Sequence, residues 1–436
     1  MPVSFVHHPL RAARRLGLLA VGLLGLALLA ACSSGTDVNI VSSQPVDTQT
    51  VDFGLVYIKR TVPTTQDDLR LRRTYALSAD LYLLKPSSQG GMEQNITARV
   101  TNSGPWDIKD VDVSSDGTRV IFAMRGPIAT KQKDFATPTW NIWEYVVATD
   151  TLHMLVPTSD PLGTGAEYVS PHYLADGRIL FSTTRQVDAG SVLINEGEPE
   201  FEGQTEDLNE SAFVLHVMDA PTGSGTGIQT CTGLHQLTFN QSHDVDATVL
   251  NNGRIMYSRW DDANGNSGIH LYTANPDGTD VELLYGFGSH VTANTNPGGA
   301  TDCPANLDCT VQFVHAREMP GGQVLALNRP FTPANFGGNL QIINTQNFIE
   351  NNYSYPGTLC TQNNQSAPCL SATTGMQPAT MNNVVAAVNT AGATPVPAIS
   401  PGGRFSSAFP LWDGSGRILV TWTDCRLQNT VNAVTT

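Results

Sequence analysis

Residues 110–125 read DVDVSSDGTRVIFAMR: an extended segment, a turn at Asp116-Gly117 and an apolar strand. An Asp-Gly turn between two such segments predicts a β-hairpin, because the tight turn needs the positive φ that glycine adopts readily. The same unit recurs as EYVSPHYLADGRILFSTTR (167–185), DVDATVLNNGRIMYSR (244–259), VHAREMPGGQVLALNR (314–329) and FSSAFPLWDGSGRILVTW (405–422). A motif that recurs in this way predicts a repeat architecture.

A second hairpin is predicted after three of the units. These hairpins cover residues 140–157, residues 213–220 with 234–240, and residues 269–286. Three further strands, at 53–60, 79–86 and 95–101, form most of an earlier unit. Four antiparallel strands per unit predict an all-β fold made of β-propeller blades. A β-sandwich also explains regular strands and turns, but it does not predict the same hairpin motif recurring with a second hairpin after it.

Counting the units gives a propeller domain over residues 51–425 with six blades. The last unit stops after its second strand, so we expect the sixth blade either to be incomplete or to be closed by residues 36–50. Residues 426–436 form a tail, which is consistent with a truncated continuation of the domain.

The N-terminus predicts export. Arg11, Arg14 and Arg15 precede an apolar run over 16–29, which is shorter than the roughly 20 residues of a membrane-spanning helix. Leu29-Ala30-Ala31-Cys32 resembles the lipobox of bacterial lipoproteins. The resemblance implies a signal peptide over 1–31, lipidation of Cys32, a linker over 32–50 and membrane attachment through the lipid. Ser33 after the cysteine resembles the sorting signal for the periplasmic side of the Gram-negative outer membrane. An ordinary signal peptide with an incidental cysteine is the alternative.

The mature chain is strongly acidic. The formal net charge is −15, and removing residues 1–31, which contain three arginines and no acidic residue, takes it to −18. Such a charge repels nucleic acid and anionic membrane surfaces. It is compatible with a periplasmic protein partner.

Six cysteines remain after Cys32, an even number that predicts disulfides in an exported chain. Cys303 with Cys309 and Cys360 with Cys369 are close enough in sequence to bridge their own loops. Cys231 and Cys425 are then left for each other, although the sequence leaves other pairings open.

Two motifs carry a family resemblance. The S-x-D-G-x-R-V-x-F core at 114–122 and the L-Y-x-x-N-P-D-G-T-D hairpin at 271–280 resemble the TolB-like and WD40-like propeller repeats. A narrower resemblance, over 106–125, 141–145, 174–185, 237–261 and 270–280, is to the middle propeller domain of the hydrazine synthase alpha subunit. That family works through c-type haems at C-x-x-C-H motifs, and this chain contains none. The string Cys231-Thr-Gly-Leu-His235 has one residue too many and lacks the second thiol.

A Ser-His pair recurs ahead of two units. LTFNQSH (237–243) and LLYGFGSH (283–290) place His243 and His290 at corresponding positions, with Asp244 and Asp246 after the first. Links between propeller blades lie at one end of the central channel, so we expect these side chains at the channel mouth. Histidine and carboxylate ligands suit a divalent transition metal. The alternative is that Asp244 and Asp246 bond loop amides and His243 caps a turn. No cofactor is certain from the sequence.

An arginine follows the second strand of four units, at Arg125, Arg185, Arg259 and Arg329. A ring of guanidinium groups would attract an anionic ligand. The other reading is that each arginine pairs with an acidic residue of a neighbouring blade; suitable acids are Asp110, Asp112, Glu167, Asp244 and Asp246.

No catalytic motif stands out. Residues 262–273 partly match a calcium loop, but Ser267 and Thr273 replace its expected Gly and Glu, so we expect a polar hairpin loop. The first hypothesis is a non-catalytic scaffold that binds a protein or ligand. The second is an enzyme or redox-enzyme subunit related to hydrazine synthase, using either a metal at the His243/His290 channel mouth or a haem on another chain. A carbohydrate-active propeller is a third.

Overall fold

The computed structural model describes most of the chain between residues 53 and 435. The described residues are 53–61, 78–86, 91–128, 138–157, 165–188, 211–221, 223, 225–240, 242–263, 266–286, 311–330, 339–350, 353–354, 359–362, 365–368, 376–378, 404–423, 430–431 and 434–435. Residues 1–52, with the predicted signal peptide and Cys32, lie outside the described part.

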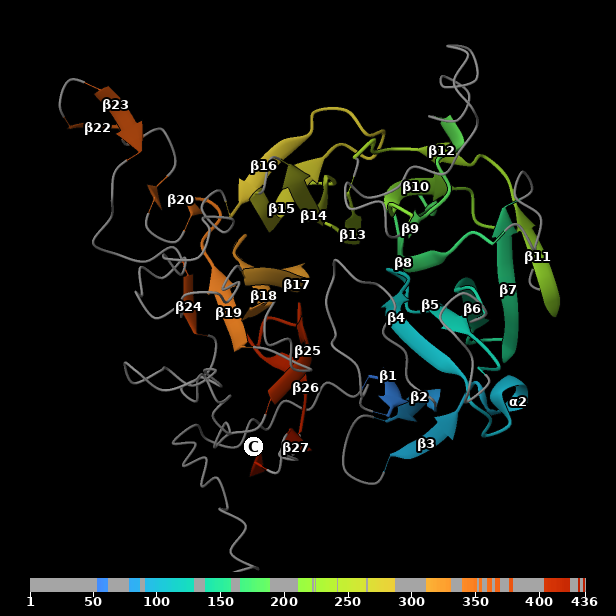
Figure 1. Cartoon of the computed structure of the whole chain (residues 1–436). Coiled ribbons are helices and arrows are strands. Elements are labelled where there is room, and N and C mark those ends of the chain that lie inside the picture. The colour runs from blue at the N-terminus through green and yellow to red at the C-terminus, as the bar shows by residue number, and fades with distance from the viewer. Residues whose placement is uncertain are drawn as a thin grey trace, which may run out of the picture. The chain divides into compact units, whose positions relative to one another are not determined.

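The described strands form a β-propeller (Figure 1). Blade 1 contains β1 (Leu55–Arg60), β2 (Ala79–Lys85) and β3 (Met92–Asn95). Blade 2 contains β4 (Asp107–Val113), β5 (Arg119–Arg125), β6 (Asn141–Val146), β7 (Thr151–Pro157) and β11 (Gly227–Cys231). Blade 3 contains β8 (Tyr168–Tyr173), β9 (Ile179–Thr183), β10 (Val214–Met218) and β12 (His235–Gln236). Blade 4 contains β13 (Asp244–Val249), β14 (Ile255–Ala263), β15 (Asn266–Ala274) and β16 (Glu282–Tyr285). Blade 5 contains β17 (Val311–Glu318), β18 (Val324–Pro330), β19 (Asn339–Ile343) and β24 (Met376–Pro378).

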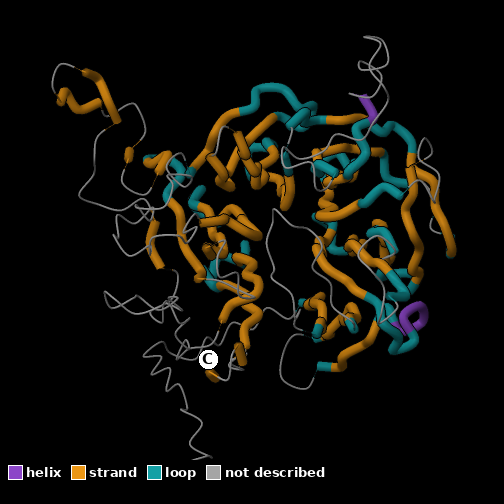
Figure 2. The backbone as a smooth tube through the Cα atoms, viewed as in Figure 1, coloured by secondary structure: helices purple, strands orange, loops and turns teal. Residues whose placement is uncertain are grey.

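The remaining strands form two-stranded ladders. These are β20 (Phe348–Glu350) with β21 (Tyr353–Ser354), β22 (Leu359–Gln362) with β23 (Gln365–Pro368), β25 (Arg404–Pro410) with β26 (Ile418–Thr423), and β27 (Thr430–Val431) with β28 (Val434–Thr435). Strands dominate the described trace (Figure 2).

Two predictions about the blades are wrong. The described residues form five blades of three to five strands rather than six, because the unit at 405–422 supplies only the β25–β26 ladder. The strand predicted at 95–101 is instead the end of β3 followed by helix α2 (Ala98–Thr101). Asn95 Oδ1 accepts a hydrogen bond from the Ala98 amide at 2.9 Å, and Thr97 Oγ1 donates to Asp80 Oδ1 at 2.8 Å. These side chains turn the backbone away from the sheet.

The predicted first hairpins are confirmed in all five units. β4 pairs with β5, β8 with β9, β13 with β14, β17 with β18, and β25 with β26, each antiparallel. The turn glycines have positive φ, as at Gly117 (69°) and Gly253 (84°). The amide of Gly117 donates to the Ser114 carbonyl at 2.8 Å, and that of Gly253 donates to the Leu250 carbonyl at 2.9 Å. The second hairpins β6–β7, β10–β12 and β15–β16 also form.

The hydrophobic core lies between blades. Phe122 of β5 packs in the cluster shared with blade 1, whereas Ile121, its neighbour in sequence, packs in the cluster shared with blade 3. Alternate side chains of a strand point to opposite faces, so a blade between two others needs apolar residues on both faces. Full burial of a side chain such as Phe122 contributes roughly 2–3 kcal/mol to folding.

One strand joins a blade that its sequence neighbours do not belong to. β11 lies between β10 and β12 in sequence, yet it pairs in parallel with the outer edge of β7 in blade 2. The register runs from Gly227 opposite His153 to Cys231 opposite Pro157. The loop between the two outer strands of blade 3 therefore supplies the outermost strand of blade 2.

Candidate binding cavity on the inner strands

The innermost strands of blades 2 to 5 share one irregular position. Each carries a β-bulge, and one residue of each bulge has positive φ: Asp110 (56°), Ser170 (51°), Asp246 (53°) and His315 (53°). A left-handed conformation costs a non-glycine residue on the order of 1 kcal/mol. A bulge also re-aims its side chain relative to a regular strand. The fold therefore holds the same strained conformation at the same place in four blades.

The four bulge residues line one small cavity. Val111, Pro171, Ala247 and Arg317 complete its lining. The cavity volume is about 20 Å³. This is enough for one small group, because a single water molecule needs a cavity of roughly 10–15 Å³. We call it the channel cavity, because the innermost strands of four blades contribute its walls.

Ser170 connects the two carboxylates of the channel cavity. Its amide donates to Asp110 Oδ2 at 2.9 Å. Its Oγ lies 3.2 Å from Asp110 Oδ2 and 3.3 Å from Asp246 Oδ1. A serine hydroxyl has one proton, so it can donate to only one of the two carboxylates at a time.

Asp246 is the least satisfied group of the cavity. The residue is only 7% exposed, and its Oδ2 is buried without a hydrogen-bond partner among the described residues. A carboxylate oxygen that is taken out of water and left unpaired is costly. The channel cavity thus presents an unused, negatively charged acceptor.

Charged groups border the cavity next to the bulges. Asp112 accepts from the Tyr173 amide at 3.1 Å and lies 2.9 Å from His172 Nδ1. Burial would raise the pKa of Asp112, but the nearby His172, the hydrogen bonds and the charge of Arg317 together hold that pKa below its usual value. Arg317 donates to the Ala316 carbonyl at 2.8 Å. The charge of Asp112 is therefore balanced by His172 and Arg317.

The structure describes three of the four residues predicted to form a metal site: His243, Asp244 and Asp246. His243 is buried, its Nδ1 accepts from the Phe213 amide at 3.1 Å, and its ring packs against Phe213 and Trp260. Asp244 holds the guanidinium of Arg259 through bonds of 2.8 and 3.1 Å. Of the predicted set only Asp246 lines the channel cavity, and His290 lies outside the described residues.

In the described ranges, no group of three or more histidine, cysteine, aspartate or glutamate side chains is arranged to hold a metal ion. Residues 262–263 end β14 and residues 266–273 belong to β15, so most of the segment predicted as a loop at 262–273 is paired strand. The disulfide candidates Cys303, Cys309, Cys369 and Cys425 lie outside the described part, as does the side chain of Cys360; Cys231 is buried at the end of β11.

Two of the four recurring arginines have ion-pair partners in their own hairpins. Arg259 pairs with Asp244, its register partner across the β13–β14 hairpin. Arg125 lies 3.7 Å from Asp107, its register partner in β4, and stacks over Trp140. Asp107 also forms a contact between blades, because Arg60 of β1 donates two hydrogen bonds to its carboxylate at 2.7 and 2.9 Å. Arg185 follows β9, and the side chain of Arg329 lies outside the described part.

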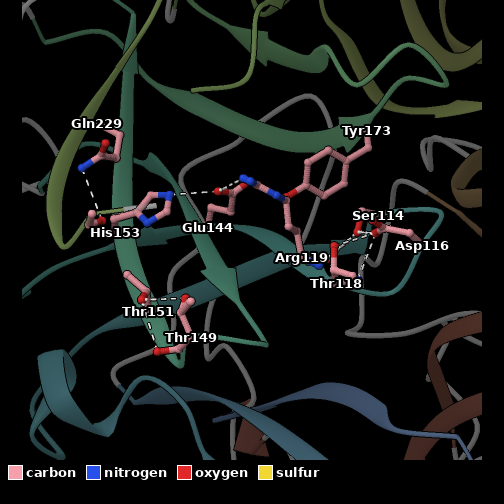
Figure 3. Close-up of polar contacts among 11 residues, drawn as sticks. Ser114, Asp116, Thr118, Arg119, Glu144, Thr149, Thr151, His153, Tyr173 and Gln229 are labelled. Atoms are coloured by element: carbon pink, nitrogen blue, oxygen red, sulfur yellow. Dashed lines mark hydrogen bonds and ion pairs between the residues drawn. The ribbon is translucent and has the colours of Figure 1, made fainter. Parts of the chain in front are cut away.

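A buried polar cluster around Glu144 joins blades 2 and 3 (Figure 3). Glu144 Oε2 accepts from Arg119 at 2.8 Å and lies 2.9 Å from His153 Nε2, while Tyr173 donates to Glu144 Oε1 at 2.8 Å. Burial would raise the pKa of Glu144, but the bonds from His153 and Tyr173 and the charge of Arg119 hold it below its usual value. All the named partners satisfy one carboxylate, so we assign this cluster to blade packing.

Sequence reasoning missed Ser170, His315 and Arg317 as cavity residues. The sequence feature that could have located the bulge residues is their distance from the turn. A turn glycine follows each of them after seven residues: Asp110, Ser170, Asp246 and His315. The residue type changes from unit to unit, so a search for repeated residues does not find the position.

These features define a β-propeller with a polar cavity between the inner strands of four blades. No protein-family model matches the chain, and no curated protein sequence matches it. Among solved structures, the chain is similar to hydrazine synthase of Kuenenia stuttgartiensis, with a TM-score of 0.52 and 16% identity over 86% of this chain and 42% of that chain. It is also similar to a putative TolB of Agrobacterium tumefaciens, with a TM-score of 0.30 and 16% identity over 49% of this chain and 60% of that one.

The comparisons bear on the fold. At 16% identity the hydrazine synthase likeness shows the propeller fold alone, and the matched region is less than half of that chain. Within the described ranges, no helix is long and apolar enough to cross a membrane.

Proposed function

We propose that the chain is a binding protein of the Gram-negative envelope, attached to the outer membrane through lipid on Cys32, whose propeller holds a ligand or a polar side chain of a protein partner in the channel cavity. The observation that carries the proposal is the buried, unpaired Oδ2 of Asp246 in a cavity that four blades build. If residue 246 served only in packing between blades, an apolar side chain at this position would make the fold more stable than a buried carboxylate does.

Binding is tested by a thermal-shift screen of the purified full chain against small molecules grouped by charge. We expect at least one class to raise the melting temperature, and we expect Asp246→Asn to remove that rise. Asp116→Asn is the matched control, because Asp116 lies in the exposed β4–β5 turn. A rise that survives Asp246→Asn, or no rise with any class, would contradict binding in the cavity.

Lipid attachment is tested separately. Replacement Cys32→Ser should move the chain from the membrane fraction to the soluble periplasmic fraction and abolish labelling with a radioactive fatty acid. The idea would fail if the variant stayed in the membrane fraction with unchanged labelling.

A second candidate function is suggested by the 0.52 TM-score over 86% of the chain: a subunit of a redox enzyme related to hydrazine synthase. Since residues 1–436 contain no C-x-x-C-H motif, a c-type haem for this candidate would be carried by other sequence, such as a partner chain. Purification from the native host should then bring down a second chain with a haem Soret band. Purification of the chain by itself, without absorbance near that band, would count against this candidate.

A further inference from the structure

We infer that the channel cavity binds a primary alkylammonium group, either of a free amine or of a lysine side chain that a partner presents. This inference rests on the proposed binding function and names its ligand class. It starts from the acceptors: Asp246 offers both carboxylate oxygens, one of them unpaired, and the Ser170 hydroxyl lies 3.3 Å from Asp246 Oδ1 and 3.2 Å from Asp110 Oδ2. An ammonium group has three donors and no acceptor, which matches such a set.

The charges around Asp246 favour a cationic ligand. None of the described ion pairs gives Asp246 a lysine or arginine partner, whereas Asp110 has Lys109 at 3.5 Å. The nearby Arg317 bonds a backbone carbonyl, and its charge acts on Asp112. An anion would meet two carboxylates at close range, which is repulsive. A cation would also free the Ser170 hydroxyl from serving two carboxylates with one proton.

Size and polarity favour an organic ammonium group over a metal ion. The accessible volume of about 20 Å³ suits one group of the size of water. A calcium ion needs six to eight oxygen ligands, and the two carboxylates and one hydroxyl supply fewer. Three apolar residues, Val111, Pro171 and Ala247, line the same cavity. They suit contact with the methylene group attached to the ammonium head.

The test is calorimetric titration of the purified full chain with n-butylammonium chloride. We expect saturable binding, and we expect Asp246→Asn and Ser170→Ala each to weaken it, the first by about tenfold or more because a charged hydrogen bond is lost. Asp116→Asn should bind as the unaltered chain does. If the Asp246→Asn variant does not fold, the Ser170→Ala variant and the ligand series below still test whether the cavity binds the ammonium group.

The ligand series distinguishes the chemistry. Tetramethylammonium, which lacks N–H donors, should not bind, and calcium chloride should not compete with butylammonium. Binding of calcium with no binding of butylammonium, or butylammonium binding that is unchanged in both cavity variants, overturns the inference. If a lysine-containing peptide binds more tightly than butylammonium, and lysine acetylation abolishes the peptide's binding, the ammonium group belongs to a protein partner. If the peptide and butylammonium bind with equal affinity, the ligand is a free amine.

Failure of this inference is distinguishable from failure of the proposed function. If butylammonium does not bind but the charge-grouped screen finds another class that depends on Asp246, the binding function stands and the ammonium assignment falls. If neither experiment finds a ligand that depends on Asp246, both fall.

Discussion

The imidazole of His243 lies in an apolar setting, with the Phe213 ring edge-on at 5.5 Å and the Trp260 ring at 5.3 Å between centroids. Its Nδ1 accepts a hydrogen bond from the amide of Phe213, which lies directly before β10 of blade 3. We therefore expect His243→Ala to lower the free energy of unfolding by about 2–4 kcal/mol, through lost packing and an unpaired buried amide. Urea unfolding followed by circular dichroism measures this loss.

The control for His243 is the exposed His235 of β12. His235→Ala should change the free energy of unfolding by less than about 0.5 kcal/mol. The His243→Ala loss should also be the same with and without a chelator. A loss that appears only in the absence of chelator would show that His243 holds a metal after all.

At the same scale, the position of the cavity residues was only partly predictable. The sequence repeats Asp-Val-Asp at 110–112 and at 244–246, but the bulge takes the first aspartate of one triplet and the last of the other. The sequence points to Asp246 through its residue type and its neighbour His243, and among the predicted metal-site residues that the structure describes, Asp246 alone lines the cavity. A bulge shifts the register by one residue, and residue type alone does not reveal where that shift occurs.

At the scale of elements, the hairpin turns allow a matched comparison of two glycines. Gly253 and Gly278 have φ of 84° and 83°. A Cβ on Gly253 would meet no atom within 4 Å, whereas one on Gly278 would clash with the backbone carbonyl of Leu237. We expect Gly253→Ala to cost about 1 kcal/mol, from conformation alone, and Gly278→Ala to cost about 1–3 kcal/mol more, from the clash. Urea unfolding of both variants measures the difference, and equal losses would contradict the account.

The hairpins were predictable because their signals are local: a turn glycine and an apolar strand lie within a few residues. The parallel pairing of β11 with β7 and the helix α2 were not predictable in this way. Strand β11 depends on an edge supplied by a blade far away in sequence. Helix α2 depends on Asp80, which accepts from Thr97 and from Thr101 at 2.8 and 2.6 Å.

At the scale of the whole molecule, the Glu144 cluster predicts how stability depends on pH. The folded state holds the pKa of Glu144 below its usual value, so the ionised form contributes stability above the ordinary glutamate pKa of about 4.3. That contribution is lost as the pH falls through the lower pKa of the folded state. We expect the free energy of unfolding to fall more steeply below about pH 4.3 in the unaltered chain than in Glu144→Gln.

Measurement of urea unfolding between neutral and acidic pH checks this expectation. The matched control is Glu282→Gln, because Glu282 is exposed on β16. It should keep the steep fall of the unaltered chain. If Glu144→Gln kept that fall as well, the acid sensitivity would belong to other carboxylates.

The parallel strand β11 has a consequence for how the propeller comes apart. Repeats that contact only their neighbours can unfold one at a time, but a strand that leaves blade 3 to complete blade 2 ties these two blades into one cooperative unit. An uncovered outer edge of β7 would be a template for pairing with other chains. Detachment of residues 227–231 would therefore add an uncovered strand edge to blade 2 while the core between the blades is still buried.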